Sequence, residues 1–152
     1  SDESPRAYVS RLAVDMVVAV AQRYPEQIVI GADTVVVLDD VVFGKPLDRA
    51  EAVGMLTKLA GRTHTVLTGV VVMRASTVFK GVESTEVTFV ELTSARIDWY
   101  VSRGESDDKA GAYAAQGVGS RLIERINGSY TNVVGLPMAM VDRFVQKFEQ
   151  NL

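Results

Sequence analysis

The sequence contains no cysteine and a single histidine, His64. The absence of cysteine excludes a disulfide scaffold, a zinc ribbon, an iron–sulfur site and a thiol nucleophile. One histidine excludes a metal site built from several histidines and makes a Ser-His-Asp triad a poor model for any catalysis. We interpret His64 as a structural residue that begins a strand and satisfies local backbone groups.

Long apolar runs and an excess of basic residues are also missing. No segment is apolar over the length that a membrane span requires, and the chain opens with no signal-peptide pattern. Sixteen Lys and Arg residues against nineteen Asp and Glu residues give a net charge of −3, which argues against a general nucleic-acid binder. These absences predict a soluble, cytoplasmic protein with neither nucleic acid nor membrane as a partner.

The composition is that of a folded globular protein. Hydrophobic residues make up 47% and charged residues 23% of the 152 positions, so the chain can build a sizeable core. One domain over residues 1–152 is therefore expected.

The first helix is predicted from its ends and its apolar stripe. Ser4 can cap it, Pro5 suits its first turn, and Tyr24-Pro25 ends it. The apolar stripe includes Met16, which we therefore expect in the core. Three further helices are expected on similar grounds, at residues 49–60, at residues 94–102 and from Pro137 onward.

Runs of β-branched residues predict the strands, at residues 27–38, 41–43, 64–74 and 85–91. Asn127-Gly128 is a strong hairpin signal between the apolar segments 122–126 and 130–134. The glycine-rich stretch 105–119 has no core-like period, and its length suits a functional loop. The order of the elements predicts an α/β fold, bordering on α+β, with a mixed sheet flanked by helices.

Asp33 interrupts the β-branched run of residues 27–38. A carboxylate inside an apolar strand is costly to desolvate unless it is paired, protonated or bound to a metal. One interpretation is a hydrogen-bonded structural aspartate, or a strand that ends at Gly31. The other is a metal ligand or general base at the end of a strand, where open sheets place their sites.

Two lysines lie in glycine-containing segments. Lys45 lies in a Gly-Lys-Pro turn, and Lys109 stands between Asp107-Asp108 and Ala110-Gly111. Exposed backbone N–H groups and a point charge both favour phosphate at such places. Each lysine taken alone is more typical of an ordinary surface position.

The chain carries several short motifs in order, namely Gly31-Ala32-Asp33-Thr34-Val35-Val36, Gly44-Lys45-Pro46, Leu59-Ala60-Gly61-Arg62-Thr63-His64, Asp108-Lys109-Ala110-Gly111-Ala112-Tyr113, Gln116-Gly117 and Val134-Gly135-Leu136-Pro137. This ordered set resembles the Maf family, the septum-formation-inhibitor-like nucleotide pyrophosphatases. The resemblance covers essentially the whole chain. Its specificity comes from the order of the set, since any one motif is weak.

The resemblance implies an elongated fold with a cleft, related to the inosine-triphosphate pyrophosphatases. It implies hydrolysis of a nucleoside triphosphate to the monophosphate and pyrophosphate, assisted by Mg²⁺ or Mn²⁺. Asp33 would be the proton acceptor and metal ligand, and Lys45 and Lys109 would face the phosphates. Thr34 and Gln116 match positions that follow base preference, and this pair resembles the branch that acts on dTTP and UTP. An amide suits a pyrimidine edge because it both donates and accepts.

Two departures from the family pattern weaken these expectations. The usual first strand, with its Ser-x-Ser-Pro-Arg-Arg motif, and the helix after it are absent. Ser4-Pro5-Arg6 stands at the start of a later helix, so we give Arg6 no phosphate-binding role. Met16 stands where the family usually has a lysine. Fewer cations near the phosphates predict weaker catalysis, and a missing strand exposes a sheet edge that favours pairing as a homodimer.

Three hypotheses follow from the sequence. The first is a nucleoside triphosphate pyrophosphatase of the dTTP/UTP type, favoured by Asp33, Lys45, Lys109 and Gln116. The second is a catalytically impaired protein that binds nucleotide or a partner in cell-division control, favoured by Met16 and the absent motif. The third is that the natural protein has an N-terminal segment before this sequence.

Overall fold

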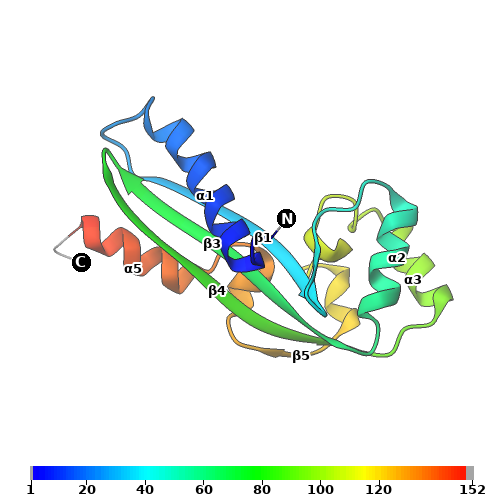
Figure 1. Ribbon diagram of the computed structural model, residues 1–152. Coiled ribbons are helices and arrows are strands. Elements are labelled where there is room, and N and C mark those ends of the chain that lie inside the picture. Colours follow the sequence, from blue (N-terminus) through cyan, green and yellow to red (C-terminus); the bar gives the residue numbers. More distant parts are fainter. Residues whose placement is uncertain (1, 150–152) are drawn as a thin grey trace.

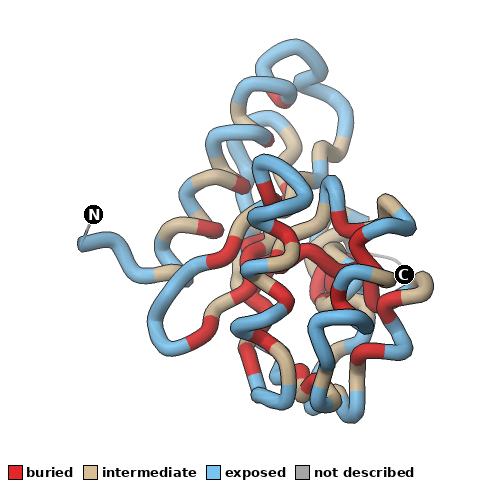
Figure 2. Tube along the Cα trace, turned by 90° about the vertical axis from the view of Figure 1, so that its right-hand side faces the viewer, coloured by how far each residue is buried: buried red, intermediate tan, exposed pale blue. Residues whose placement is uncertain are grey.

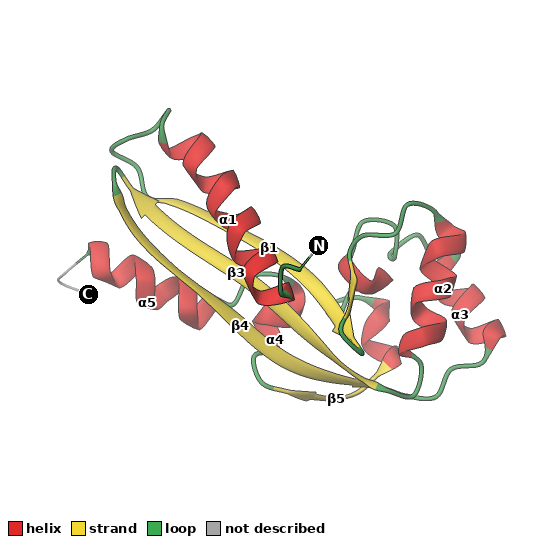
Figure 3. Ribbon diagram, viewed as in Figure 1, coloured by secondary structure: helices red, strands yellow, loops and turns green. Residues whose placement is uncertain are grey.

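The computed structural model describes residues 2–149 and has an elongated sheet with helices on both faces (Figures 1 and 3). The sheet order is β2-β1-β3-β4-β5. The strands are Val29–Leu38 (β1), Val41–Phe43 (β2), Thr63–Arg74 (β3), Thr77–Phe89 (β4) and Ile123–Asn127 (β5). The helices are Pro5–Ala21 (α1), Arg49–Leu59 (α2), Ser94–Val101 (α3), Tyr130–Val134 (α4) and Met138–Phe148 (α5), with short 3₁₀ helices Ala110–Ala112 (η1) and Val118–Leu122 (η2).

Side-chain caps begin three of the helices, as the sequence predicts. The Ser4 hydroxyl accepts a hydrogen bond from the N–H of Ala7 at 3.1 Å, and the Asp48 carboxylate accepts one from Glu51 at 2.8 Å. Thr93 caps α3 in the same way. Each cap satisfies a backbone donor that has no partner inside the helix, so α1, α2 and α3 start where expected.

The sheet confirms the α/β class but differs from the prediction in strand direction. All four strand pairings among residues 2–149 are antiparallel, whereas the sequence predicted a mixed sheet. Tight turns such as the one between β3 and β4 reverse the chain, and only a longer crossover would allow parallel neighbours. Strand β4 also begins at Thr77, earlier than the predicted Thr85, because it pairs with β3 along almost its whole length.

The predicted hairpin around Asn127-Gly128 is wrong. The first segment is a strand, β5, but it pairs with β4, and the second segment is the helix α4. The hydroxyl of Ser129 accepts a hydrogen bond from the N–H of Asn132 at 3.1 Å and caps this helix. A local cap together with the position of Asn132 in the core outweighs the turn propensity of the Asn-Gly pair.

The two faces of the sheet carry different helices (Figure 1). Val9 and Val17 of α1 pack over Gly69 and Gly31, where an added Cβ would strike the helix. The opposite face carries α4, α5 and, at the far end, α2 and α3, which close the largest apolar cluster.

Met16 is not in the core. Its side chain is 45% exposed, whereas its neighbour Val17 is 1% exposed. Figure 2 shows α1 alternating between buried and exposed positions along its length. The buried positions of α1 recur at a spacing of four residues, namely Val9, Ala13, Val17 and Ala21. The stripe that faces the sheet is therefore narrower than the apolar stripe in the sequence, because the sheet contacts only one line of the helix.

The outer edge of β1 is only partly paired. Strand β2 covers Val36, Val37 and Leu38, and no strand among the described residues covers the same edge from Val29 to Val35. Within residues 2–149 this part of the β1 edge therefore has no strand partner.

No helix within residues 2–149 combines the length and the apolar character that are needed to cross a membrane.

Candidate functional site

One pocket is lined by all five residues that the sequence singled out. It has a volume of about 230 Å³ and lies between β1, the segment after β2, the region of η1 and α4. Strand β1 supplies Asp33 and Thr34, and the other three come from separate loops, namely Lys45, Lys109 and Gln116. Three consecutive β1 residues, 32–34, line the pocket although successive side chains of a strand point to opposite faces. The pocket therefore extends around the free edge of this strand.

A backbone hydrogen bond holds the two lysine-bearing segments together. The N–H of Gly111 donates to the carbonyl of Gly44 at 3.1 Å. Gly111 has φ +69°, and a Cβ at this position would lie 2.7 Å from Cγ2 of Val36. A glycine is needed there both for the left-handed backbone and for the close approach to β1, so it fixes where Lys109 enters the pocket relative to Lys45.

Asp33 is half-buried, and its carboxylate accepts no hydrogen bond from any residue between 2 and 149. Burial raises the pKa of its carboxyl group, and the positive charge of Lys45 offsets part of that rise. The two side chains form no ion pair within 4.0 Å. Of the two interpretations from the sequence, the structure therefore disfavours a hydrogen-bonded structural aspartate and leaves a carboxylate that is available to a ligand.

The ionisable side chains that line the pocket balance in charge. The charged ones are Asp33, Lys45, Asp108 and Lys109, while Tyr113 is neutral, and Lys109 Nζ lies 3.7 Å from Asp108 Oδ1. An anionic ligand such as a triphosphate therefore meets little net positive charge from the pocket itself.

This charge balance fits a divalent cation that arrives with a phosphate ligand. The described residues contain no group of three or more Asp, Glu, His or Cys side chains that could hold a metal by themselves. Magnesium is usually held by one or two carboxylates together with substrate phosphates. Asp33, with its free carboxylate, and Asp108, which also lines the pocket, fit that donor set.

Thr34 lies at the end of the pocket next to α4. Its Oγ1 is 2.8 Å from Oγ1 of Thr68 and 3.5 Å from the carbonyl of Gly135. Gln116 is exposed, and its side chain has no hydrogen bond to any other described residue. The Gln116 amide is therefore free to meet a ligand, whereas the Thr34 hydroxyl is held in place.

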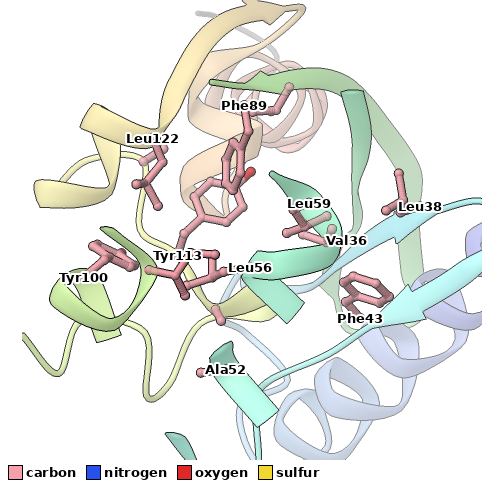
Figure 4. Close-up of a cluster of buried hydrophobic side chains, with 14 of the residues drawn as sticks. Val36, Leu38, Phe43, Ala52, Leu56, Leu59, Phe89, Tyr100, Tyr113 and Leu122 are labelled. Atoms are coloured by element: carbon pink, nitrogen blue, oxygen red, sulfur yellow. The ribbon is translucent and has the colours of Figure 1, made fainter. Parts of the chain in front are cut away.

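Sequence reasoning missed most of the apolar wall of the pocket, including Tyr113. The hydroxyl of Tyr113 is 2.7 Å from Nε2 of His64, which is 2% exposed. Burial lowers the pKa of His64 to about 4, so this ring is neutral at pH 7. His64 is structural, as predicted, but its partner is a side chain rather than the local backbone. Figure 4 shows Tyr113 and Phe89 in the same apolar cluster, with ring centroids 4.8 Å apart.

Comparison with known proteins agrees with this arrangement. The family described as "Maf-like protein" matches residues 1–148. The chain belongs to the Maf family. This Maf chain is 49% identical over 146 residues to a dTTP/UTP pyrophosphatase of Symbiobacterium thermophilum, covering 96% of the chain and 75% of the relative. Its identity to a dTTP/UTP pyrophosphatase of Thermoanaerobacter pseudethanolicus is 46%, over 100% of the chain and 82% of the relative.

A third relative of the Maf chain has the same name. It comes from Bacillus cytotoxicus and is 46% identical, over 96% of the chain and 76% of the relative. These relatives are longer than the present sequence, which matches three quarters or more of each.

Proposed function

We propose that this Maf protein hydrolyses dTTP and UTP to the nucleoside monophosphate and pyrophosphate in the cytoplasm. The observation that carries the proposal is the gathering of Asp33, Thr34, Lys45, Lys109 and Gln116 around one pocket. The relatives named dTTP/UTP pyrophosphatase support the choice of substrate.

Asp33 is the general base in this proposal. Burial raises its pKa, which makes the carboxylate a better proton acceptor than an exposed aspartate. It accepts a proton from a water molecule whose oxygen attacks the α-phosphorus. The bond from that phosphorus to the oxygen bridging to the β-phosphorus then breaks, and pyrophosphate leaves with the bond electrons.

Lys45 and Lys109 act on the leaving pyrophosphate. Both line the pocket on segments tied by the hydrogen bond between Gly111 and Gly44, so their charges enter from a fixed frame. Preorganised positive charge stabilises the negative charge that develops on the leaving oxygens. A divalent cation held by Asp33 and Asp108 would add neutralisation of the phosphate charge.

Thr34 and Gln116 select the base. A glutamine amide both donates and accepts, which suits the N–H and carbonyl groups on a pyrimidine edge. Thr34 is held by Thr68 and Gly135, and so shapes that end of the pocket against a larger base.

The test is pyrophosphate release from dTTP, UTP, GTP and 7-methyl-GTP in Mg²⁺ or Mn²⁺, with wild type, Asp33→Asn and Asp98→Asn. We expect dTTP and UTP to give the highest kcat/KM, Asp33→Asn to abolish turnover, and the exposed control on α3 to be unchanged. A preference for the guanine nucleotides would contradict the choice of base. Equal turnover by wild type and Asp33→Asn would remove Asp33 from the mechanism.

A second candidate function is nucleotide binding without hydrolysis. In that case the protein acts in cell-division control through the bound nucleotide. The balanced charge of the pocket favours it, because two lysines opposed by two aspartates stabilise a departing pyrophosphate weakly. Tight dTTP binding by calorimetry without pyrophosphate release would favour this candidate over the enzyme.

We also propose that two copies associate along the uncovered part of β1. From Val29 to Gly31, outside the pocket, this edge has no strand partner among the described residues, and Ile30 within it is 43% exposed. Open edges of this kind favour pairing with another strand. Light scattering should report a dimer for wild type and a monomer for Ile30→Lys, since a charged side chain on an edge strand opposes pairing with another strand. A monomeric wild type would contradict the proposal.

A further inference from the structure

The carboxylate of Glu105, outside the pocket, holds the backbone that follows Gln116 in the chain. Glu105 follows α3 and accepts hydrogen bonds from the N–H of Val118 at 2.9 Å and of Gly119 at 2.8 Å. It also accepts the phenol proton of Tyr100 at 2.7 Å. Both carboxylate oxygens are thus occupied by donors, two of which belong to the chain just after Gln116.

The hydroxyl group of Tyr100 holds the backbone that precedes Gln116 in the chain. Its hydroxyl oxygen accepts a hydrogen bond from the N–H of Ala114 at 3.0 Å. Tyr100 is fully buried in the apolar cluster of Figure 4, where it extends from α3. The Tyr100–Glu105 pair therefore links the backbone before Gln116 to the backbone after it through a connected series of hydrogen bonds.

Hydrogen bonds and burial keep the Glu105 carboxylate deprotonated and the Tyr100 phenol protonated. Burial works to raise the pKa of Glu105, but hydrogen bonds from Tyr100, Gly119 and Val118 outweigh it and hold that pKa below its usual range. Burial and the bond to Glu105 raise the pKa of Tyr100. At neutral pH the carboxylate is therefore charged and the phenol remains a donor.

Two glycines of the segment 114–119 pack closely against this frame. A Cβ at Gly117 would collide with the carboxylate of Glu105, and one at Gly119 would collide with the carbonyl of Ala114. The N–H of Gly117 also donates to that carbonyl at 3.2 Å, which makes a tight turn with Gln116 at its third position.

Gln116 depends on this frame for its direction. Its side chain has no hydrogen bond to any other residue in the described part of the chain, although it lines the pocket. The backbone on both sides of Gln116 is therefore what aims its amide at a ligand, and that backbone is fixed by Tyr100 and Glu105.

We propose that Glu105, together with Tyr100, is a positioning residue that sets base preference by fixing the backbone around Gln116. The inference rests on the proposed function, and it adds residues that touch neither the nucleotide nor the reacting atoms. Loss of the frame lets the Gln116 amide sample several directions, so it weakens base selection more than it slows the chemical step.

The experiment compares Tyr100→Phe and Glu105→Gln with two matched controls, Tyr24→Phe and Glu124→Gln, which change exposed side chains. The ratio of kcat/KM for dTTP over GTP is measured for each, with circular dichroism to check folding. We expect both test variants to lower this ratio about tenfold, mainly through a higher KM for dTTP, in line with the loss of one hydrogen bond to a charged group. The controls should keep the wild-type ratio.

A double-mutant cycle separates positioning from general damage to the fold. In a Gln116→Ala background, Glu105→Gln should lower the ratio no further, because the side chain that it positions is gone. Amide exchange by NMR should be faster at Ala114, Val118 and Gly119 in both test variants and unchanged in the controls.

The outcomes distinguish this inference from the proposed function. A wild-type protein that shows no preference for dTTP contradicts the proposed function and the inference with it. If the wild-type preference for dTTP survives both test substitutions, the positioning role alone is overturned. The same holds if Glu105→Gln lowers the dTTP/GTP ratio as much in the Gln116→Ala background as in the wild type.

Discussion

The side-chain amide of Asn132 donates a hydrogen bond to the carbonyl of Val66 at 3.1 Å and so joins α4 to the middle of β3. The same amide donates to Oγ1 of Thr85 on β4 at 2.9 Å. Asn132 is fully buried, and the residues that follow it, 133–135, line the pocket. This polar contact in the core therefore fixes one wall of the candidate site.

Replacing Asn132 should destabilise the protein. Asn132→Ala removes the donor to Val66 and to Thr85, whose Oγ1 keeps the N–H of Ser129 as a donor, so the free energy of unfolding should fall by about 2 kcal/mol. Asn127→Ala, on the exposed end of β5, is the matched control and should change it by less than about 0.5 kcal/mol. Urea unfolding followed by fluorescence measures both, and equal midpoints would show that the Asn132 contacts add nothing.

Two glycines should respond to alanine with opposite sign. Gly111→Ala forces φ +69° on an alanine and places its Cβ against Val36, so we expect a loss of about 1–3 kcal/mol in the free energy of unfolding. Gly54 lies inside α2 with nothing within 4 Å of an added Cβ. Gly54→Ala should therefore stabilise the protein by about 0.5–1 kcal/mol. Thermal unfolding decides the sign, and a stabilising Gly111→Ala would contradict the described loop.

The buried His64 should make stability depend on pH. Its folded pKa of about 4 lies below the ordinary value of 6.5, so between these values the unfolded chain binds the proton and the folded chain does not. The contribution of His64 is complete above pH 6.5. It should fall by about 1.4 kcal/mol per pH unit as the pH drops towards 4.

His64→Gln isolates this effect from that of the carboxylates, because only the difference between the two pH profiles belongs to the imidazole. Since the chain has one histidine, its imidazole resonance in NMR gives the pKa directly. Titration near 6.5 in the folded protein would exclude the buried, neutral ring.

Neighbouring positions on α1 should tolerate lysine very differently. Met16→Lys replaces a side chain that is 45% exposed and should change the free energy of unfolding by less than about 0.5 kcal/mol. Val17→Lys places an ammonium against Gly31 in the core and should destabilise by about 3 kcal/mol or more. Denaturant midpoints measure both variants. A large loss for Met16→Lys would restore the core position expected from the sequence.

Local chemistry was enough to predict the starts of α1, α2 and α3 and the positions of most strands along the chain. Ser4, Asp48 and Thr93 accept hydrogen bonds from donors three residues later, and that interaction depends only on nearby residues. Five of the residues that line the pocket were also proposed from sequence, Asp33 as a carboxylate in an apolar strand and the other four through the ordered motifs, whereas most of the apolar wall was missed.

Other features depend on contacts between distant parts of the chain. Residues 130–134 form a helix because Asn132 meets Val66 and Thr85, which no local pattern around Asn127-Gly128 reveals. Met16 is exposed because the sheet beneath α1 contacts only the line through Val9, Ala13 and Val17.

The sequence by itself singled out five candidate site residues that line one pocket, because residue type and short spacing decide what a side chain can donate, accept or neutralise. Only the tertiary structure decided how those residues act together. The hydrogen bond between Gly111 and Gly44 joins the segments that carry Lys109 and Lys45, and Tyr100 with Glu105 fixes the backbone around Gln116. Both arrangements join segments separated along the chain, so they come into being only when the sheet and its helices have packed.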